Sequence, residues 1–139
     1  MKQRYSVPAL VIILFMIFYI FSVYGEESET EKCRTFLNGF GWRVSDTPSD
    51  EAEISIPSEF DEVYKSYNAM QKKSGLDLME YSGKSGRRYT FEVLNYPIDA
   101  GETVYANVIC IDGKAVGGDI MTVSLSGFMH SLNENTPEK

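Results

Sequence analysis

The segment 104–123, VYANVICIDGKAVGGDIMTV, carries the strongest structural signals in the sequence. Its first part, 104–111, is a nearly continuous apolar run, which is typical of a strand in the centre of a sheet. Asp112-Gly113 then gives a strong hairpin signal, and 115–123 returns as the partner strand. The preceding segment 88–96 alternates and predicts a third strand. It places three apolar side chains on one face: Tyr89, Phe91 and Val93.

Two amphipathic helices are predicted upstream of these strands. Apolar residues recur at helical spacing in 33–40, and glycines end that run. A second helix follows Ser58, which we predict to be its N-cap, and ends at Gly75. Its apolar stripe comprises Phe60, Val63, Tyr64, Tyr67 and Met70.

Short strands are predicted at 42–44 and 54–56, with a loop at 45–53 between them. Consecutive antiparallel strands with helices upstream are typical of an α+β protein. The sequence therefore predicts an α+β fold, in which two helices pack on one face of a mainly antiparallel sheet that ends in a three-strand meander.

The segment 7–24 is apolar and carries no charge. About 20 apolar residues span a bilayer as a helix, and a signal-peptide core is usually shorter. Lys2 and Arg4 precede the segment and glutamates follow it, which orients the C-terminal part away from the cytoplasm. We expect a single-pass signal anchor in the cell membrane, with a cleaved signal peptide and secretion as the alternative.

This gives the following predicted organisation. Residues 1–25 are a signal anchor or signal peptide and 26–31 an acidic spacer. A single extracytoplasmic α+β domain covers 32–132, about the usual size for one domain, and 133–139 is a frayed tail.

The charge excludes one class of partner. The net charge of the chain is −7, and all but two of its 13 basic residues, together with all 20 acidic ones, follow the apolar segment. The domain is therefore acidic and repels phosphate backbones, so we expect no nucleic-acid partner.

Cys33 and Cys110 are the only cysteines. Cys33 lies on the apolar side of the first predicted helix, and Cys110 lies in the central strand. A disulfide between them would close a long loop and stabilise the domain by roughly 4 kcal/mol. Two buried, inert thiols are the alternative, which we favour because free cysteines are among the most buried residues.

Two groups of residues are candidate partner-binding sites. Lys84, Arg87 and Arg88 form the basic cluster of an acidic domain and would attract an anionic partner, although a solvated loop is the simpler interpretation. Gly117-Gly118 interrupts the returning strand beside Asp119. Adjacent glycines either mark a bulge, the favoured interpretation, or an opening for a ligand.

No pattern in the sequence predicts catalysis, a metal site or a cofactor. His130 is the single histidine and lacks a recognisable nucleophile, and metal sites usually need several His or Cys ligands. Gly83-Lys84-Ser85 lacks the leading glycine of a phosphate-binding loop, since position 78 is leucine. We therefore predict that the protein is not an enzyme and binds no cofactor.

Five strings together resemble a known family. They are FLNGFGWRV, IPSEFDEVYKSYNAMQKKSGLDLMEYSGK, RRYTFEVLNYP, ANVICIDGKAVGGDI and SGFMHSL, within 33–132. In this order they resemble an uncharacterised domain-of-unknown-function family of short, singly membrane-anchored proteins from clostridial-type Gram-positive bacteria. The resemblance implies an anchored single domain and assigns no activity or functional residue.

The leading functional hypothesis is a membrane-anchored envelope protein that binds another protein or a wall polymer. A small-ligand or sugar-binding module that uses the Gly117-Gly118 opening is the alternative. A hydrolase with an unrecognised carboxylate site is a more distant one.

Overall fold

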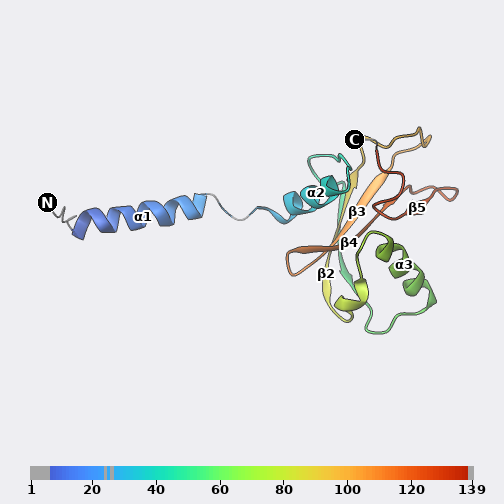
Figure 1. Ribbon diagram of the computed structural model, residues 1–139, viewed down its shortest axis with the longest axis horizontal. Helices are drawn as coiled ribbons and strands as arrows, with labels where there is room; N and C mark the ends of the chain where they lie inside the picture. Colours follow the sequence, from blue (N-terminus) through green and yellow to red (C-terminus); the bar gives the residue numbers. More distant parts are fainter. Residues whose placement is uncertain (1–6, 24, 26, 138–139) are drawn as a thin grey trace.

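A five-stranded antiparallel sheet organises the protein in the computed structural model, which describes residues 7–23, 25 and 27–137 (Figure 1). The strands follow the chain in the order β1-β2-β3-β4-β5 across the sheet. They are β1 (Asp50–Ser55), β2 (Ser85–Glu92), β3 (Tyr105–Ile111), β4 (Lys114–Met121) and β5 (Met129–His130). Three helices, α1 (Val7–Val23), α2 (Glu29–Gly39) and α3 (Glu62–Lys73), and the 3-10 helix η1 (Leu78–Tyr81) complete the fold. The α+β prediction is confirmed.

The predicted meander is the centre of the sheet. Strand β3 pairs with β2 on one side and with β4 on the other, both antiparallel. The β3–β4 turn has positive φ at Asp112 (50°) and Gly113 (74°), which is the backbone of the tight hairpin turn that Asp-Gly favours. A β-bulge between Ile109 and Cys110 then shifts the register of the two strands by one residue.

Strand β1 is longer than predicted and includes part of the predicted loop 45–53. It begins at Asp50, inside the predicted loop 45–53, while 42–44 contributes only an isolated bridge from Val44 to Val93. Its acidic residues point to solvent, so local propensity did not indicate a strand. Pairing with β2 supplies the missing stabilisation, and charged residues are common on such edge strands.

Both sheet-packing helices differ in detail from their predictions. Helix α2 begins at Glu29, capped by the Ser28 hydroxyl, so half of the predicted spacer 26–31 is helical. The N-cap of α3 is Asp61, whose side chain accepts from the Tyr64 backbone N–H, and not Ser58. Val63, predicted to be buried, is 77% exposed, because the face of α3 that packs on the sheet carries Tyr64, Tyr67, Asn68 and Gln71.

The two helices cover opposite faces of the sheet, not one face as predicted. Alternation along β3 directs Val108 and Cys110 to one face and Ile109 and Ile111 to the other. The first face packs against α2, in a cluster that includes Cys33, Leu37, Trp42 and Leu132. The second face packs against α3 and η1, in a cluster that includes Ile56, Leu78, Val116 and Tyr67.

Helix α1 lies apart from the sheet and exposes apolar side chains along its length (Figure 1). It has 17 residues, and within the part of the chain that the structure covers no helix has both the length and the hydropathy needed to cross a membrane. Lys2 and Arg4, which carry the predicted orientation, lie outside the described residues, as does Glu26 of the predicted spacer.

The chain after β5 folds back and is ordered at Asn133 and Glu134, in contrast to the predicted frayed tail. Trp42 Nε1 donates to the Leu132 carbonyl oxygen at 2.7 Å and fastens the segment to the core. Residues 138–139 of the predicted tail lie outside the described residues.

Candidate functional site

The sheet face that carries α3 is only partly covered, and its uncovered part forms a groove. Helix α3 and η1 pack over the end of the face near the β3–β4 turn, where the apolar cluster lies. Beyond them, a cavity of about 330 Å³ opens across β1 to β4. This sheet groove is lined by Ser49, Asp50, Arg88, Thr90, Tyr105, Asn107, Met121 and Val123. Six of these eight side chains carry a group that can donate or accept hydrogen bonds, and Met121 and Val123 are apolar.

A chain of side-chain hydrogen bonds crosses the sheet beside this groove. Tyr67 Oη donates to Asp119 Oδ2 at 2.7 Å, and Asn107 Nδ2 donates to Asp119 Oδ1 at 2.9 Å. Thr90 Oγ1 then donates to Asn107 Oδ1 at 2.6 Å. These four residues, the polar ladder, connect α3, β4, β3 and β2. They face the same way because Asp119 pairs with Asn107, and Asn107 with Thr90, directly across the strands.

The polar ladder keeps a carboxylate in the protein interior. Asp119 is 2% exposed, and burial raises its pKa, opposed by the hydrogen bonds from Asn107 and Tyr67. Burial, and next the neighbouring Asp119 charge, raise the pKa of Tyr67, so its phenol stays protonated and donates. Both carboxylate oxygens therefore have donors, as a buried charge requires.

Arg88 brings positive charge to the rim of the sheet groove. Its Nη2 lies 3.2 Å from Asp50 Oδ2 on the neighbouring edge strand, and the Arg88 side chain is 42% exposed. Among the described residues, nothing hydrogen bonds with its buried Nε. A guanidinium has five N–H donors, so this ion pair leaves donors for a ligand.

The predicted basic cluster does not stay together. Arg87 and Arg88 are consecutive in β2, so their side chains lie on opposite faces of the sheet. Arg87 Nη1 lies 3.6 Å from Glu51 Oε2 on the α2 face. Lys84 precedes the strand, with its Nζ 3.9 Å from Asp112 Oδ2 and 6.0 Å from the Tyr81 ring. Only Arg88 reaches the sheet groove.

The favoured interpretation of Gly117-Gly118, a bulge, agrees with the register shift beside Gly117, and the alternative ligand opening is filled by the protein itself. A Cβ at Gly117 would lie 2.8 Å from Leu78 Cδ2, and one at Gly118 would lie 2.6 Å from the Asn107 carbonyl oxygen. The Gly118 N–H donates to Gln71 Oε1 of α3 at 2.8 Å. Both glycines allow close packing beside the bulge, and Asp119 alone of this group joins the polar ladder.

The two cysteines lie together on the opposite face from the sheet groove. Cys33 Sγ and Cys110 Sγ are 3.0 Å apart, and both side chains are buried between α2 and β3. Burial of both thiols agrees with the favoured prediction, and the two sulfurs meet across the helix–sheet interface. Oxidation of the pair stays a prediction.

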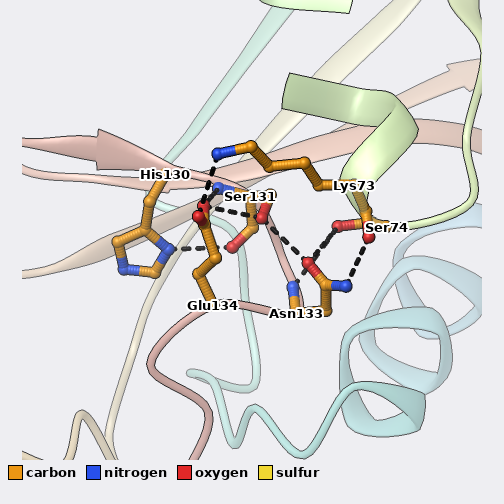
Figure 2. A network of polar contacts seen from close by, with 6 residues as sticks. All are labelled: Lys73, Ser74, His130, Ser131, Asn133 and Glu134. Carbon is orange, nitrogen blue, oxygen red and sulfur yellow. Dashed lines mark hydrogen bonds and ion pairs between the residues drawn. The ribbon is translucent and has the colours of Figure 1, made fainter. Parts of the chain in front are cut away.

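His130 belongs to a structural network at the C-terminal end of the chain (Figure 2). Its Nδ1 lies 2.8 Å from the Ser131 carbonyl oxygen, which only accepts, so Nδ1 carries the proton and Nε2 accepts from the Tyr96 hydroxyl at 2.9 Å. The buried Ser131 hydroxyl lies 2.8 Å from Glu134 Oε2 instead. The histidine thus does not act on this serine as a base.

The other members of this network fasten the tail to the end of α3. Lys73 Nζ lies 3.0 Å from Glu134 Oε1, and Asn133 Nδ2 donates to the Lys73 carbonyl oxygen (Figure 2). Ser74 Oγ donates to Asn133 Oδ1 at 3.2 Å. These contacts explain why the tail is ordered.

Sequence reasoning missed most of the residues around the sheet groove. Asn107 is the one strongly polar residue in the apolar run of β3, and that interruption was a usable signal. An unbulged hairpin about Asp112-Gly113 would pair Asn107 with Gly118, whereas the bulge pairs it with Asp119. Asp50, Tyr67 and Thr90 are distant in sequence and had no comparable signal.

The fold and the groove define an α+β domain with one polar, partly covered sheet face. The chain belongs to the family described as domain of unknown function, DUF4830, whose model matches residues 36–120. The match begins within α2 and ends within β4, so it includes most of the sheet groove and all of the polar ladder. No significant match was found among curated proteins or solved structures.

Proposed function

We propose that this protein is a non-enzymatic binding protein of the cell envelope, which holds a hydroxyl-rich segment of a wall polymer in the sheet groove. The observation that carries this proposal is the combination of an open groove with a fixed polar floor. Its Thr90 and Asn107 side chains are held in position by the polar ladder. Preorganised polar groups lose little entropy on binding.

The lining chemistry favours a carbohydrate-like ligand. Arg88 donates and Asp50 accepts, which suits a ligand with many hydroxyls. The Ser49 and Thr90 hydroxyls already donate within the protein, so their oxygens accept from such a ligand. Tyr105, Met121 and Val123 supply apolar area for the C–H faces of sugar rings. The volume of about 330 Å³ is at the small end of ligand sites and suits one or two rings.

Binding is favoured over catalysis because the ionisable groups around the groove already have partners. Both oxygens of Asp119 accept from side chains, and Asp50 pairs with Arg88. A general base or nucleophile needs an oxygen that reaches the substrate. The acidic balance of the domain further favours a neutral or weakly charged polymer over a strongly anionic one.

The envelope location rests on helix α1. Its large apolar side chains are exposed on all sides, for example Phe15 at 70%, Phe18 at 75% and Phe21 at 80%. A continuous apolar surface of this kind marks a membrane or protein contact. We therefore propose attachment to a membrane through α1, in agreement with the resemblance to singly anchored bacterial proteins, and flotation with liposomes tests it.

The groove is tested by isothermal titration of the full chain, in detergent micelles, with soluble wall glycan fragments. Arg88→Ala removes the charged donor from the groove, and we expect affinity to fall roughly 10- to 100-fold, the equivalent of one hydrogen bond to a charged group. Arg87→Ala is the matched control, because Arg87 is adjacent to Arg88 in β2, has similar side-chain exposure and lies on the other face of the sheet.

The control should change affinity less than about twofold, since a lost exposed ion pair contributes little. Equal losses of affinity in both variants would indicate general electrostatic attraction and would reject the sheet groove as the binding site. A third outcome is that the titrations give no heat with any glycan while the wild-type chain captures a protein that Arg88→Ala does not capture. That result would reject the glycan and identify a protein as the partner.

A further inference from the structure

The strongest feature outside the sheet groove is the pair of cysteines in the other face of the sheet. Cys33 on α2 and Cys110 on β3 are 77 positions apart, yet their Sγ atoms are separated by 3.0 Å. They are 0% and 2% exposed. The pair therefore connects the helix that follows α1 to the central strand of the sheet.

The surroundings of the two cysteines favour oxidation to a disulfide. The packed neighbours in this cluster are apolar, Leu37, Tyr89 and Val108 among them. Within the described part of the chain, no group of three or more His, Cys, Asp or Glu side chains could hold a metal ion, so these thiols are not part of a metal-ligand set. Each sulfur faces the other, which is the arrangement that oxidation to a disulfide requires.

We propose that Cys33 and Cys110 form a structural disulfide as the chain folds in an oxidising compartment. The oxidant is a low-molecular-weight disulfide. One cysteine thiolate attacks it, forms a mixed disulfide and expels one thiol. The second cysteine thiolate then attacks the mixed disulfide and expels the other thiol. Two protein thiols are oxidised, the reagent disulfide is reduced to two thiols, and the two protons pass to the departing thiolates.

The bond forms before the core has closed. In the folded, reduced chain, the contact with Cys110 and burial both raise the pKa of the Cys33 thiol far above its ordinary value, and the thiolate is the reactive form. Both cysteines are also almost completely buried, which keeps reagents in solution away from them. Oxidation during folding is therefore the productive route, and the buried bond is afterwards protected from reductants. It is independent of the sheet groove, which lies on the opposite face.

The test is to refold the full chain in mild detergent with a mixture of reduced and oxidised glutathione. The product is unfolded in an alkylating reagent and its intact mass and peptides are analysed. We expect a monomer with no alkylated cysteine and one peptide pair joined through Cys33 and Cys110. Two alkylated cysteines, or dimers linked through disulfides, would overturn the proposal.

A second test compares the melting temperatures of the oxidised and the reduced wild-type chain. It does not depend on whether a cysteine variant folds. A bond that closes so long a loop should raise the melting temperature by about 10 °C or more. The double variant Cys33→Ala, Cys110→Ala is the control and should melt at the same temperature with and without reductant. Equal melting of the two wild-type forms would reject a structural role for the bond.

Discussion

At the scale of single residues, the chain relies on polar side chains that meet partners far away in sequence. Glu134 is the clearest case, because it binds the end of α3 as well as its own turn. Its Oε2 accepts from the backbone N–H of Ser131 at 3.0 Å and lies 2.8 Å from the Ser131 hydroxyl, while Oε1 pairs with Lys73 (Figure 2). These contacts, led by the Ser131 backbone N–H, lower the pKa of Glu134 to about 2.

A pH-dependent loss of stability follows from that shift. The ordinary value is 4.5, so the stabilisation by Glu134 is fully present above pH 4.5 and is lost as the pH falls towards 2. Glu134→Gln should therefore be less stable than the wild type at pH 7 and equally stable near pH 2. Chemical denaturation followed by fluorescence of Trp42, the single tryptophan, measures this because Trp42 donates to the tail at Leu132.

Glu80→Gln is the control for Glu134, since it removes an exposed carboxylate on η1. It should follow the wild-type pH profile. A constant stability difference between wild type and Glu134→Gln from pH 7 to pH 2 would contradict the assigned contacts.

At the scale of elements, the sheet depends on close packing at β4. Gly118 lies where α3 and the tail both approach the strand. A Cβ there would lie 2.6 Å from the Asn107 carbonyl oxygen and 3.0 Å from Leu132 Cδ1, and the first of these is backbone that moves little. The same strand places Asp119 in the polar ladder, so displacement of β4 would also disturb the groove floor.

Gly118→Ala is therefore expected to destabilise the protein by about 1–3 kcal/mol, as overpacking usually does. Gly39→Ala is the matched control, because nothing lies within 4 Å of a Cβ at that helical position and its φ is ordinary. Urea denaturation of both variants measures the difference in the free energy of unfolding. A Gly118→Ala variant as stable as the control would show that β4 and its neighbours relax easily.

At the scale of the whole molecule, one chain combines an apolar helix with an acidic sheet domain, and the helix lies apart from the sheet (Figure 1). The exposed apolar surface of α1 is costly in water, whereas the sheet domain buries its own core. Attachment through α1 would hold the sheet groove close to a membrane surface. The element nearest to α1 is α2, which the proposed disulfide would fasten to β3.

We expect the full chain to float with liposomes of phosphatidylcholine and phosphatidylglycerol. Leu14→Arg places a charge in the middle of α1, where a charge costs about 2.5–3.5 kcal/mol in the bilayer. The membrane partition coefficient, measured by flotation at several lipid concentrations, should therefore fall roughly 100-fold. Val63→Arg is the control, because this exposed residue belongs to α3. A wild-type chain that stays at the bottom of the gradient would reject the attachment.

The fold class, the central meander and the existence of α2 and α3 were predictable from the amino-acid sequence. The reason is that these features depend on local signals: the period of the apolar residues and the Asp112-Gly113 turn. The sequence indicated only the end of β1, as the predicted strand 54–56, and missed 50–53, because the acidic residues there are stabilised by pairing with β2, more than 30 residues away.

Only the tertiary structure decided which residues form the candidate site. Alternation along β2 separates Arg87 from Arg88, and a single bulge gives Asn107 the partner Asp119 instead of Gly118. The groove exists because α3 covers one half of a sheet face and leaves the other half open. The Asp112-Gly113 turn fixes the register where the hairpin begins, whereas the bulge and the placement of α3 depend on packing between distant segments.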